Sequence, residues 1–298
     1  MSDEPTTGRA VPTPNTQRIP FGFTSPSGNR VRIHAGNAVL GFSALRGAAK
    51  VQWLMTSGAS HTAERLWARS VRRLLRVNLE ISGADNIKTD TQYIVMPLHE
   101  GFMDVPMLLH LPLDLRFTVR QELFAEPALS SYLKATGQIA VPDEPSVSSL
   151  RAMYQGIGDA IGAGASVVVF PQGSILGIEV AFQYGAARLA KHFGLSVLPV
   201  AIAGTHTVWE FPYSQTVRLD RSVKMTVFEP IPAGNITTTS FREAERSIKR
   251  SALKSGAPAR RFVPERDGWW DSYDFEIDPD FPELLERVQA RRSSSSHQ

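Results

Sequence analysis

The sequence predicts an α/β protein with a single mixed, largely parallel central sheet, flanked by helices and preceded by an N-terminal amphipathic helical segment. Short apolar runs alternate with longer segments of helical periodicity from residue 77 onward. Runs such as 166–170 are apolar after their first residue, as expected of strands covered on both faces. At 298 residues, with 42% hydrophobic and 20% charged residues, the chain can bury a substantial core.

The expected elements are read from two periodicities. Runs rich in Val, Ile and Leu that are bounded by Gly, Pro, Asn or Asp predict strands at 77–81, 93–96, 115–119, 138–141, 166–170, 196–202 and 223–228. Apolar residues that recur every three or four positions predict helices at 61–77, 105–111, 124–136, 147–163, 178–193 and 240–254.

The remaining segments set the domain organisation. Residues 1–35, whose first part is rich in Pro and Thr and lacks the apolar stretch of a secretory signal, are expected to be a disordered tail. Residues 36–76 form the helical segment, 77–255 the main domain, and 256–298 a C-terminal extension with a disordered end. In that extension, Trp269 and Trp270 lie close to several Arg residues, which fits either a membrane-interface belt or a tail that wraps the domain.

The helical segment before the domain is basic and amphipathic. Residues 37–57 are apolar and are expected to form a helix that is buried or lies on a membrane. Because Arg46 and Lys50 interrupt them, no membrane span is expected. In the next helix one side carries Arg65, Arg69, Arg72 and Arg76, and the other carries Ala63, Trp67, Val71 and Leu74. Two interpretations fit this pattern: a helix that lies on an anionic membrane surface, or a helix packed on the core with a solvated basic face.

Composition excludes several kinds of chemistry. The chain has no Cys, which excludes thiolate catalysis, disulfides and Cys-ligated zinc. The formal net charge is only +3, and this small excess does not indicate nucleic-acid binding. No metal site is expected either, because there is no His-Glu-x-x-His motif and no second His close to His99.

The residues Pro97 to Asp104 form the turn on which the functional interpretation rests. An apolar run stops at Pro97, His99 follows, and Asp104 begins the next apolar segment. An imidazole and a carboxylate across one strand-to-helix turn can act as a general base and the group that orients it. The alternative is a surface His near an Asp that caps a helix.

Four sequence blocks follow one another around and after this turn. They are His99-Glu100-Gly101-Phe102-Met103-Asp104, Phe117 to Pro127 with Gly137 downstream, Val167 to Ser174, and Val197 to Ile202 followed by Gly204-Thr205. Together they resemble the blocks of the glycerolipid acyltransferases, the lysophosphatidate acyltransferase-like enzymes with a His-x4-Asp motif. The resemblance covers residues 77–232. A near match, His110 with Asp114, is expected to be structural.

The resemblance implies a membrane-associated O-acyltransferase that needs no cofactor. His99 takes the proton from an acceptor hydroxyl that attacks an acyl thioester, and Asp104 orients His99. Backbone amides around Gly101 and Gly173 are candidate oxyanion donors. The expected substrate contacts are Arg120, Gln172, Gly173 and Ser174.

The resemblance also sets the expected partners and location. The acyl donor is acyl-CoA or acyl carrier protein, and the acceptor is a lipid-like hydroxyl compound. An apolar groove for the acyl chain is expected beside His99. The protein is expected to lie peripherally on the cytoplasmic face of the cell membrane.

Departures from the family pattern concern the acceptor. Two arginines that are understood to hold a glycerol phosphate correspond here to Asp143 and Ile175, and the usual Glu of the third block is Gln172. Neither Asp nor Ile can make the bidentate bonds by which Arg binds phosphate. The acceptor is therefore expected to differ from glycerol phosphate or lysophosphatidate. A lipid-binding or carrier protein on a decayed domain, and a hydrolase with the same base, are the alternatives.

Overall fold

The computed structural model of the chain describes residues 60–125, 127–142, 146–210, 216–267 and 275–295. The tail predicted at 1–35 and the apolar helix predicted at 37–57 lie outside these residues. The same holds for Asp143, Trp269 and Trp270.

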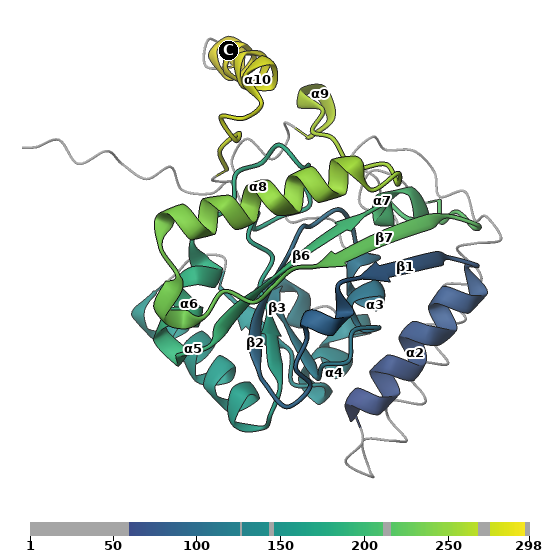
Figure 1. Ribbon diagram of the computed structural model, residues 1–298, viewed down its shortest axis with the longest axis vertical. Helices are drawn as coiled ribbons and strands as arrows, with labels where there is room; N and C mark the ends of the chain where they lie inside the picture. Colours follow the sequence, from purple (N-terminus) through teal and green to yellow (C-terminus); the bar gives the residue numbers. More distant parts are fainter. Residues whose placement is uncertain (1–59, 126, 143–145, 211–215, 268–274, 296–298) are drawn as a thin grey trace, which may run out of the picture.

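The described residues form one seven-stranded sheet, in the order β1-β7-β6-β2-β5-β3-β4 (Figure 1). All neighbouring strands pair in parallel except β6 and β7, which are antiparallel. The predicted mixed, largely parallel sheet is therefore confirmed. The strands are β1 (Asn78–Ser82), β2 (Tyr93–Pro97), β3 (Leu115–Arg120), β4 (Ile139–Val141), β5 (Ser166–Val168), β6 (Ser196–Ala203) and β7 (Ser222–Val227).

The core lies along the central strands. Every residue of β2 is buried, and so is every residue of β6 after Ser196, because helices cover both faces of the sheet there. Residues of β7 alternate between buried and more exposed positions, and β1 at the sheet edge contains no buried residue. The continuous apolar runs of the central strands thus correspond to complete burial.

The helices and 3-10 turns lie between the strands. The helices are α2 (Ser60–Leu74), α3 (Asp104–Leu108), α4 (Pro127–Ala135), α5 (Val147–Gly162), α6 (Gly185–Phe193), α7 (Thr205–Val208), α8 (Thr238–Lys254), α9 (Pro264–Asp267) and α10 (Pro282–Ser295). The 3-10 turns are η1 (Ala84–Asn86), η2 (Gln121–Ala125) and η3 (Ala233–Asn235). Capping boxes formed by Ser146 with Ser149 and by Thr237 with Ser240 begin α5 and α8.

Two helical layers cover the sheet. Helices α5, α6 and α8 pack directly on the strands of one face, with α8 against β6 and β7 (Figure 1). Helix α3 links β2 to β3 in the opposite direction along the sheet from the links made by α5 and α6. Right-handed crossovers therefore place α3 on the other face, where α2 packs against it.

One predicted helix is wrong in its first half. The sequence predicts a helix over 178–193, but α6 begins only at Gly185. The preceding apolar residues bond to the C-terminal segment instead: the Ile178 amide donates to the Arg260 carbonyl at 2.9 Å, and Val180 forms a bridge with Ile277. Long-range pairing therefore replaces the local helix.

The C-terminal segment packs on the domain over residues 257–267 and 275–288. A second apolar cluster joins residues after the third block to this segment; its buried members are Leu176, Val180, Phe262, Phe275, Ile277, Leu284 and Val288. The described part of the extension therefore wraps the domain. Helix α10 continues to Ser295, so residues 293–295 are helical.

Helix α2 is packed on the core along one side only. Ala68, Val71 and Leu75 are buried against the domain, whereas Leu66 and Leu74 are 40% and 45% exposed. The sequence placed Leu74 on the apolar, packed side, and the structure corrects this. No helix among the described residues is long and apolar enough to cross a membrane.

Glu64 is a buried carboxyl on the packed side of α2. It is 1% exposed, and its Oε1 accepts hydrogen bonds from the Tyr132 hydroxyl at 2.7 Å and from Gln138 Nε2 at 3.0 Å. Its Oε2 is buried without a hydrogen-bond partner. Burial raises the pKa of Glu64 to about 7, although the bond from Tyr132 and the charge of Arg116 act in the opposite direction.

Replacing Glu64 with Gln should stabilise the protein at high pH only. Because the folded state raises the Glu64 pKa, the stability contributed by its proton is complete below about pH 4.5 and is lost as the pH rises through 7. Glu64→Gln should raise the free energy of unfolding by up to about 3 kcal/mol at pH 8 and much less at pH 5. Urea titrations at both pH values measure this, with the exposed Glu243→Gln as control. An equal effect at both pH values would contradict the assignment.

Candidate active site

The four sequence blocks come together at one edge of the sheet. His99 follows the end of β2, Arg120 ends β3, Gln172 lies shortly after β5, and Thr205 follows β6. These strands are parallel, so their carboxyl ends meet at the same edge (Figure 1). This is where open α/β sheets bind their ligands.

His99 and Asp104 form a hydrogen-bonded pair. The His99 Nδ1 lies 2.7 Å from the Asp104 Oδ2, and the two side chains are 14% and 0% exposed. A neutral His99 donates from Nδ1 to the carboxylate, which leaves Nε2 as the basic nitrogen. Nε2 has no hydrogen-bond partner among the described residues. The pair therefore has the arrangement that a general base requires.

Asp104 begins the short helix α3 and is held from several sides. Besides His99, its Oδ2 accepts hydrogen bonds from the amides of Glu100 at 2.7 Å and Gly101 at 3.0 Å. Its Oδ1 accepts a short hydrogen bond from the Thr205 hydroxyl. These donors compensate for the burial of the carboxylate and fix its orientation relative to His99.

Two residues of the third block hold His99. The Phe170 ring stacks on the imidazole, with centroids 3.9 Å apart and planes inclined by 22°. The His99 amide donates to Gln172 Oε1 at 2.7 Å. Both the ring and the backbone of His99 are thus fixed by residues that follow β5.

Gln172 connects the turn that carries His99 to the loop after β5, residues 170–177, called the third-block loop below. Its side chain is fully buried, and its Nε2 donates to the Gly177 carbonyl at 2.5 Å. An amide satisfies both neighbours, because it accepts from the His99 N–H and donates to a carbonyl. An ionised Glu, the usual residue of the family, could not donate to Gly177. The predicted substrate contact of Gln172 is disfavoured by this burial and remains a prediction.

The glycines of the turn and loop already use their amides. The Gly101 N–H donates to Asp104, and the Gly173 N–H donates to the Phe170 carbonyl at 3.1 Å. Gly173 has a φ of +74°, which favours Gly at this position. An oxyanion would have to share these donors, so the oxyanion role stays a prediction. Ser174 lies next to them and is 7% exposed.

Arg120 and His110 differ in their relation to the site. Arg120 lies at the end of β3 and forms an ion pair with Glu122, its Nε 3.1 Å from Oε1. His110 instead bonds to the Pro106 carbonyl at 2.9 Å, and Asp114 pairs with Arg116. Burial lowers the pKa of His110. The near match His110 with Asp114 therefore makes no pair and has the structural role expected of it.

Sequence reasoning missed a second buried carboxylate beneath the turn. Glu100 is 1% exposed, and its Oε2 accepts from the Gly204 amide at 2.8 Å and lies 3.1 Å from His206 Nδ1. Its Oε1 accepts from the Arg260 amide at 2.8 Å. The sequence gives no signal for the last contact because Arg260 lies outside the four blocks.

Arg260 itself is buried beside the turn. Its guanidinium is 1% exposed and makes two hydrogen bonds to Asp267, at 2.8 and 3.2 Å. Asp267 is fully buried. The Arg260 amide thus joins the C-terminal segment to the turn that carries His99, and Asp267 balances the buried charge of the Arg260 guanidinium.

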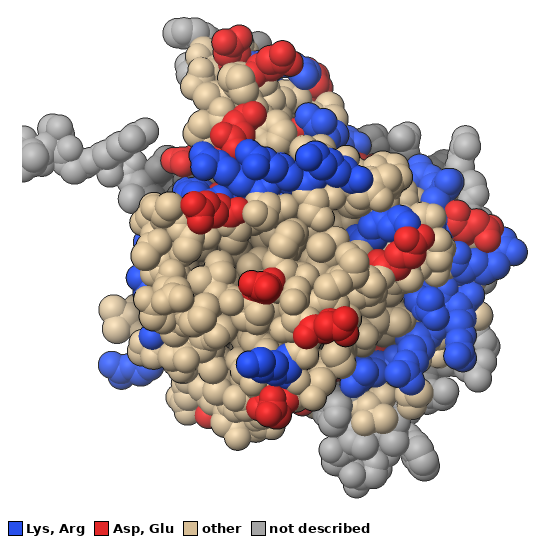
Figure 2. All heavy atoms as spheres, in the orientation of Figure 1, with Lys and Arg blue, Asp and Glu red and all other residues tan. Residues whose placement is uncertain are grey.

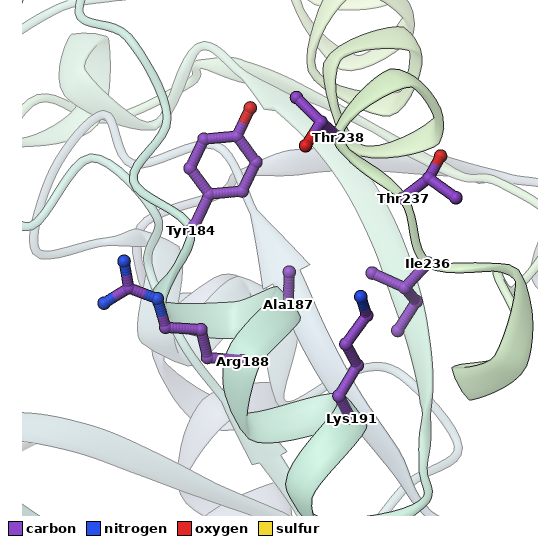
Figure 3. A pocket seen from close by; sticks show the side chains of 7 residues that line it. All are labelled: Tyr184, Ala187, Arg188, Lys191, Ile236, Thr237 and Thr238. Carbon is purple, nitrogen blue, oxygen red and sulfur yellow. The ribbon is translucent and has the colours of Figure 1, made fainter.

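Two hollows lie away from His99. One of about 280 Å³ lies between α6 and the start of α8, and its lining includes Arg188 and Lys191 of α6 and Thr237 and Thr238 (Figure 3). The other, of about 730 Å³, runs beside β4 and α5. Its lining includes Gln121 and Phe124 of the second block but not His99. The apolar groove expected beside His99 therefore stays a prediction.

Replacing Gln172 with Glu should destabilise the fold in a pH-dependent way. An ionised Glu at this position would face the Gly177 carbonyl without a donor, which should cost about 1–3 kcal/mol at pH 8. A protonated Glu can make both bonds, so the loss should shrink at pH 5. Thermal unfolding at both pH values measures this, with the exposed Gln121→Glu as control. Equal stability of Gln172→Glu and the original chain at pH 8 would contradict the proposed bonding.

Comparisons with known proteins agree with this geometry. The Acyltransferase family matches residues 78–203. The chloroplastic 1-acyl-sn-glycerol-3-phosphate acyltransferase LPAT1 of Arabidopsis thaliana is 25% identical over 195 residues, 64% of this chain and 53% of that protein. The 1-acyl-sn-glycerol-3-phosphate acyltransferase of Bacillus subtilis (strain 168) is 26% identical over 133 residues, 44% of this chain and 65% of that protein.

The chain spans about half the length of its plant relatives. The crystal structure of the 1-acyl-sn-glycerophosphate acyltransferase PlsC from Thermotoga maritima has the same fold, with a TM-score of 0.58 and 20% identity. The match covers 74% of this chain and 90% of that one. Residues 78–203 thus form an acyltransferase domain that is homologous to 1-acyl-sn-glycerol-3-phosphate acyltransferases.

Proposed function

We propose that the chain is a membrane-associated O-acyltransferase that moves a fatty acyl group from a thioester to a hydroxyl of a lipid-like acceptor. The observation that carries this proposal is the 2.7 Å contact between His99 Nδ1 and the buried Asp104. The contact lies at the sheet edge where all four blocks of the family meet. The donor is acyl-CoA or acyl carrier protein, and the reaction needs no cofactor.

Proton transfer through His99 gives a balanced reaction. Nε2 takes the proton of the acceptor hydroxyl as its oxygen attacks the thioester carbonyl carbon. The carbon–sulfur bond then breaks, and the thiolate leaves and takes the proton back from His99. Asp104 stabilises the imidazolium between these steps. Only the dyad and the positioned substrates take part, so no covalent acyl-enzyme is required.

The third-block loop supports an acceptor other than a phosphomonoester. Ile175 stands where the family usually has Arg, and it offers no donor to a phosphate. The residues after it are fixed: Leu176 is buried, and a Cβ on Gly177 would come within 2.5 Å of the Phe262 nitrogen. Arg120 already faces Glu122. A neutral or differently charged hydroxyl compound fits these surroundings better.

His99→Ala should abolish transfer while the fold is retained, because Nε2 is the proposed base. General-base catalysis is worth about 10²–10⁴-fold in rate, so His99→Asn, which can still donate to Asp104, should lose at least about a hundredfold. The assay is purified protein with labelled acyl-CoA and a membrane-lipid extract, followed by mass analysis of the acylated product. His110→Asn, which can keep the bond to Pro106, is the matched control and should stay active.

The products separate the alternatives. A new ester supports transfer, a free fatty acid indicates a hydrolase, and bound but unchanged acyl-CoA indicates a carrier. Most of the activity remaining in His99→Ala would exclude the general-base role. Phosphatidic acid as the main product would contradict the proposed change of acceptor.

Helix α2 is the proposed membrane-facing surface. Its outer side exposes Leu66 and Leu74 together with Arg69 and Arg73, and Figure 2 shows Lys and Arg gathered along this helix. Exposed leucines between arginines suit a headgroup layer, where the leucines enter the acyl boundary and the arginines meet phosphates. We place the protein peripherally, on the cytoplasmic face of the cell membrane.

Vesicle binding should depend on both the exposed arginines and the exposed leucines of α2. It should require anionic lipid and weaken with salt, because each Arg near an anionic surface contributes roughly 1 kcal/mol. Arg69→Gln with Arg73→Gln should therefore weaken binding by more than tenfold at low salt. Leu66→Ser with Leu74→Ser should weaken it at every salt concentration. Sedimentation with vesicles measures both, with Arg246→Gln on α8 as control, and equal binding to neutral vesicles would count against the proposal.

A further inference from the structure

Two buried carboxylates lie side by side beneath the catalytic turn. Asp104 is fully buried and Glu100 is 1% exposed. The hydroxyl of Thr205 contacts both: it donates to Asp104 Oδ1, and it lies 3.4 Å from Glu100 Oε2. A hydroxyl can donate one hydrogen bond, and the closer Asp104 accepts it. Thr205 is itself fully buried.

The two oxygens of Asp104 are bonded unequally. Oδ2 accepts from His99 and from the amides of Glu100 and Gly101. Oδ1 has one partner among the described residues, the Thr205 hydroxyl. Without that hydroxyl, Oδ1 would be a buried acceptor with no donor, and the plane of the carboxylate would be fixed through one oxygen only.

Thr205 is held in place by Glu100. The Glu100 carboxylate accepts from the amide of Gly204 and contacts His206, the residues on either side of Thr205. Gly204 has a φ of +97°, and a Cβ there would come within 2.4 Å of the Ser222 carbonyl oxygen. The start of α7 therefore has little freedom to move, and the Thr205 hydroxyl keeps a fixed direction toward Asp104.

We propose that Thr205 is a positioning residue for the His99 and Asp104 pair, acting through the second oxygen of Asp104. This inference rests on the proposed function, in which His99 is the base. The side chain of Thr205 does not touch the reacting atoms. It sets the carboxylate plane, so that Oδ2 remains aligned with Nδ1 while His99 carries the proton between the acceptor and the leaving thiolate. Glu100 supports this role by fixing both neighbours of Thr205.

If Thr205 positions the pair, its loss should lower turnover and leave substrate binding nearly unchanged. Thr205→Val keeps the shape and removes the hydroxyl, so kcat should fall about tenfold while the KM for acyl-CoA changes little. Asp104 without this donor is more basic and holds the Nδ1 proton more tightly, which favours the imidazolium. The acid limb of the kcat/KM profile should therefore move to higher pH.

Three further variants separate positioning from folding. Thr205→Ser keeps the hydroxyl and loses the methyl group, so it should lower Tm but recover most of the turnover. Thr205→Ala differs from Thr205→Ser only by the hydroxyl, and this pair replaces the comparison if Thr205→Val does not fold. Thr207→Val is the matched control, because it removes a hydrogen bond to the Gly204 carbonyl in the same helix without touching Asp104.

The test measures the release of free coenzyme A from a long-chain acyl-CoA in the presence of a membrane-lipid extract, across pH, together with Tm. A lower kcat with a displaced acid limb in Thr205→Val, recovered in Thr205→Ser, supports the inference. If Thr205→Val keeps the kcat and the acid limb of the original chain, the inference is overturned. It is also overturned if Thr205→Ala and Thr205→Ser have equal kcat. His99→Ala is run in parallel: if it stays active the proposed function fails as well, and if it is inactive only the Thr205 inference is at stake.

Discussion

The burial of the Asp104 carboxylate is the constraint on which the site depends. A charge that is removed from water has to be compensated by donors, and here the donors come from two different places in the chain. His99 and two amides of the turn bond to one oxygen, and Thr205 bonds to the other. The turn after β2 and the start of α7 after β6 must therefore come together before the His99 and Asp104 pair is complete. The parallel pairing of β2 with β6 brings them together.

A second layer of compensation connects the site to the C-terminal segment. One carboxylate oxygen of Glu100 accepts a hydrogen bond from the amide of Gly204, after β6, and the other accepts from the amide of Arg260. Arg260 is neutralised in turn by Asp267, which is also buried. This segment lies beyond the residues that match the family, 78–203, yet it contacts the turn that carries His99. Residues beyond the matched range 78–203 thus contribute contacts to the site of the acyltransferase domain.

Particular residues show what the sequence could and could not predict. The buried strands and the convergence of His99, Asp104 and the later blocks follow from local runs and their order. The Glu100 to Arg260 contact joins residues 160 positions apart, and no local pattern encodes it. The same long-range pairing explains the wrong helix over 178–184, whose apolar residues suit a helix equally well until the C-terminal segment takes their hydrogen bonds. Gln172 was identified as a departure, but only its two partners show why an amide fits there.

The packing of the C-terminal segment also bears on the acceptor proposed for this chain. Gly177 allows the backbone of Phe262 to approach so closely that any side chain at 177 would collide with it. Leu176 and Val180 on the same loop lie in the apolar cluster of that segment. An Arg at position 175 would therefore project from a loop whose following residues are fixed, and it would need room and solvent for its charge. Ile175, half-buried, carries no such charge. The Ile at position 175 and the close packing of this loop are thus consistent with the proposed acceptor, because a fixed apolar loop suits a compound that brings no phosphate to it.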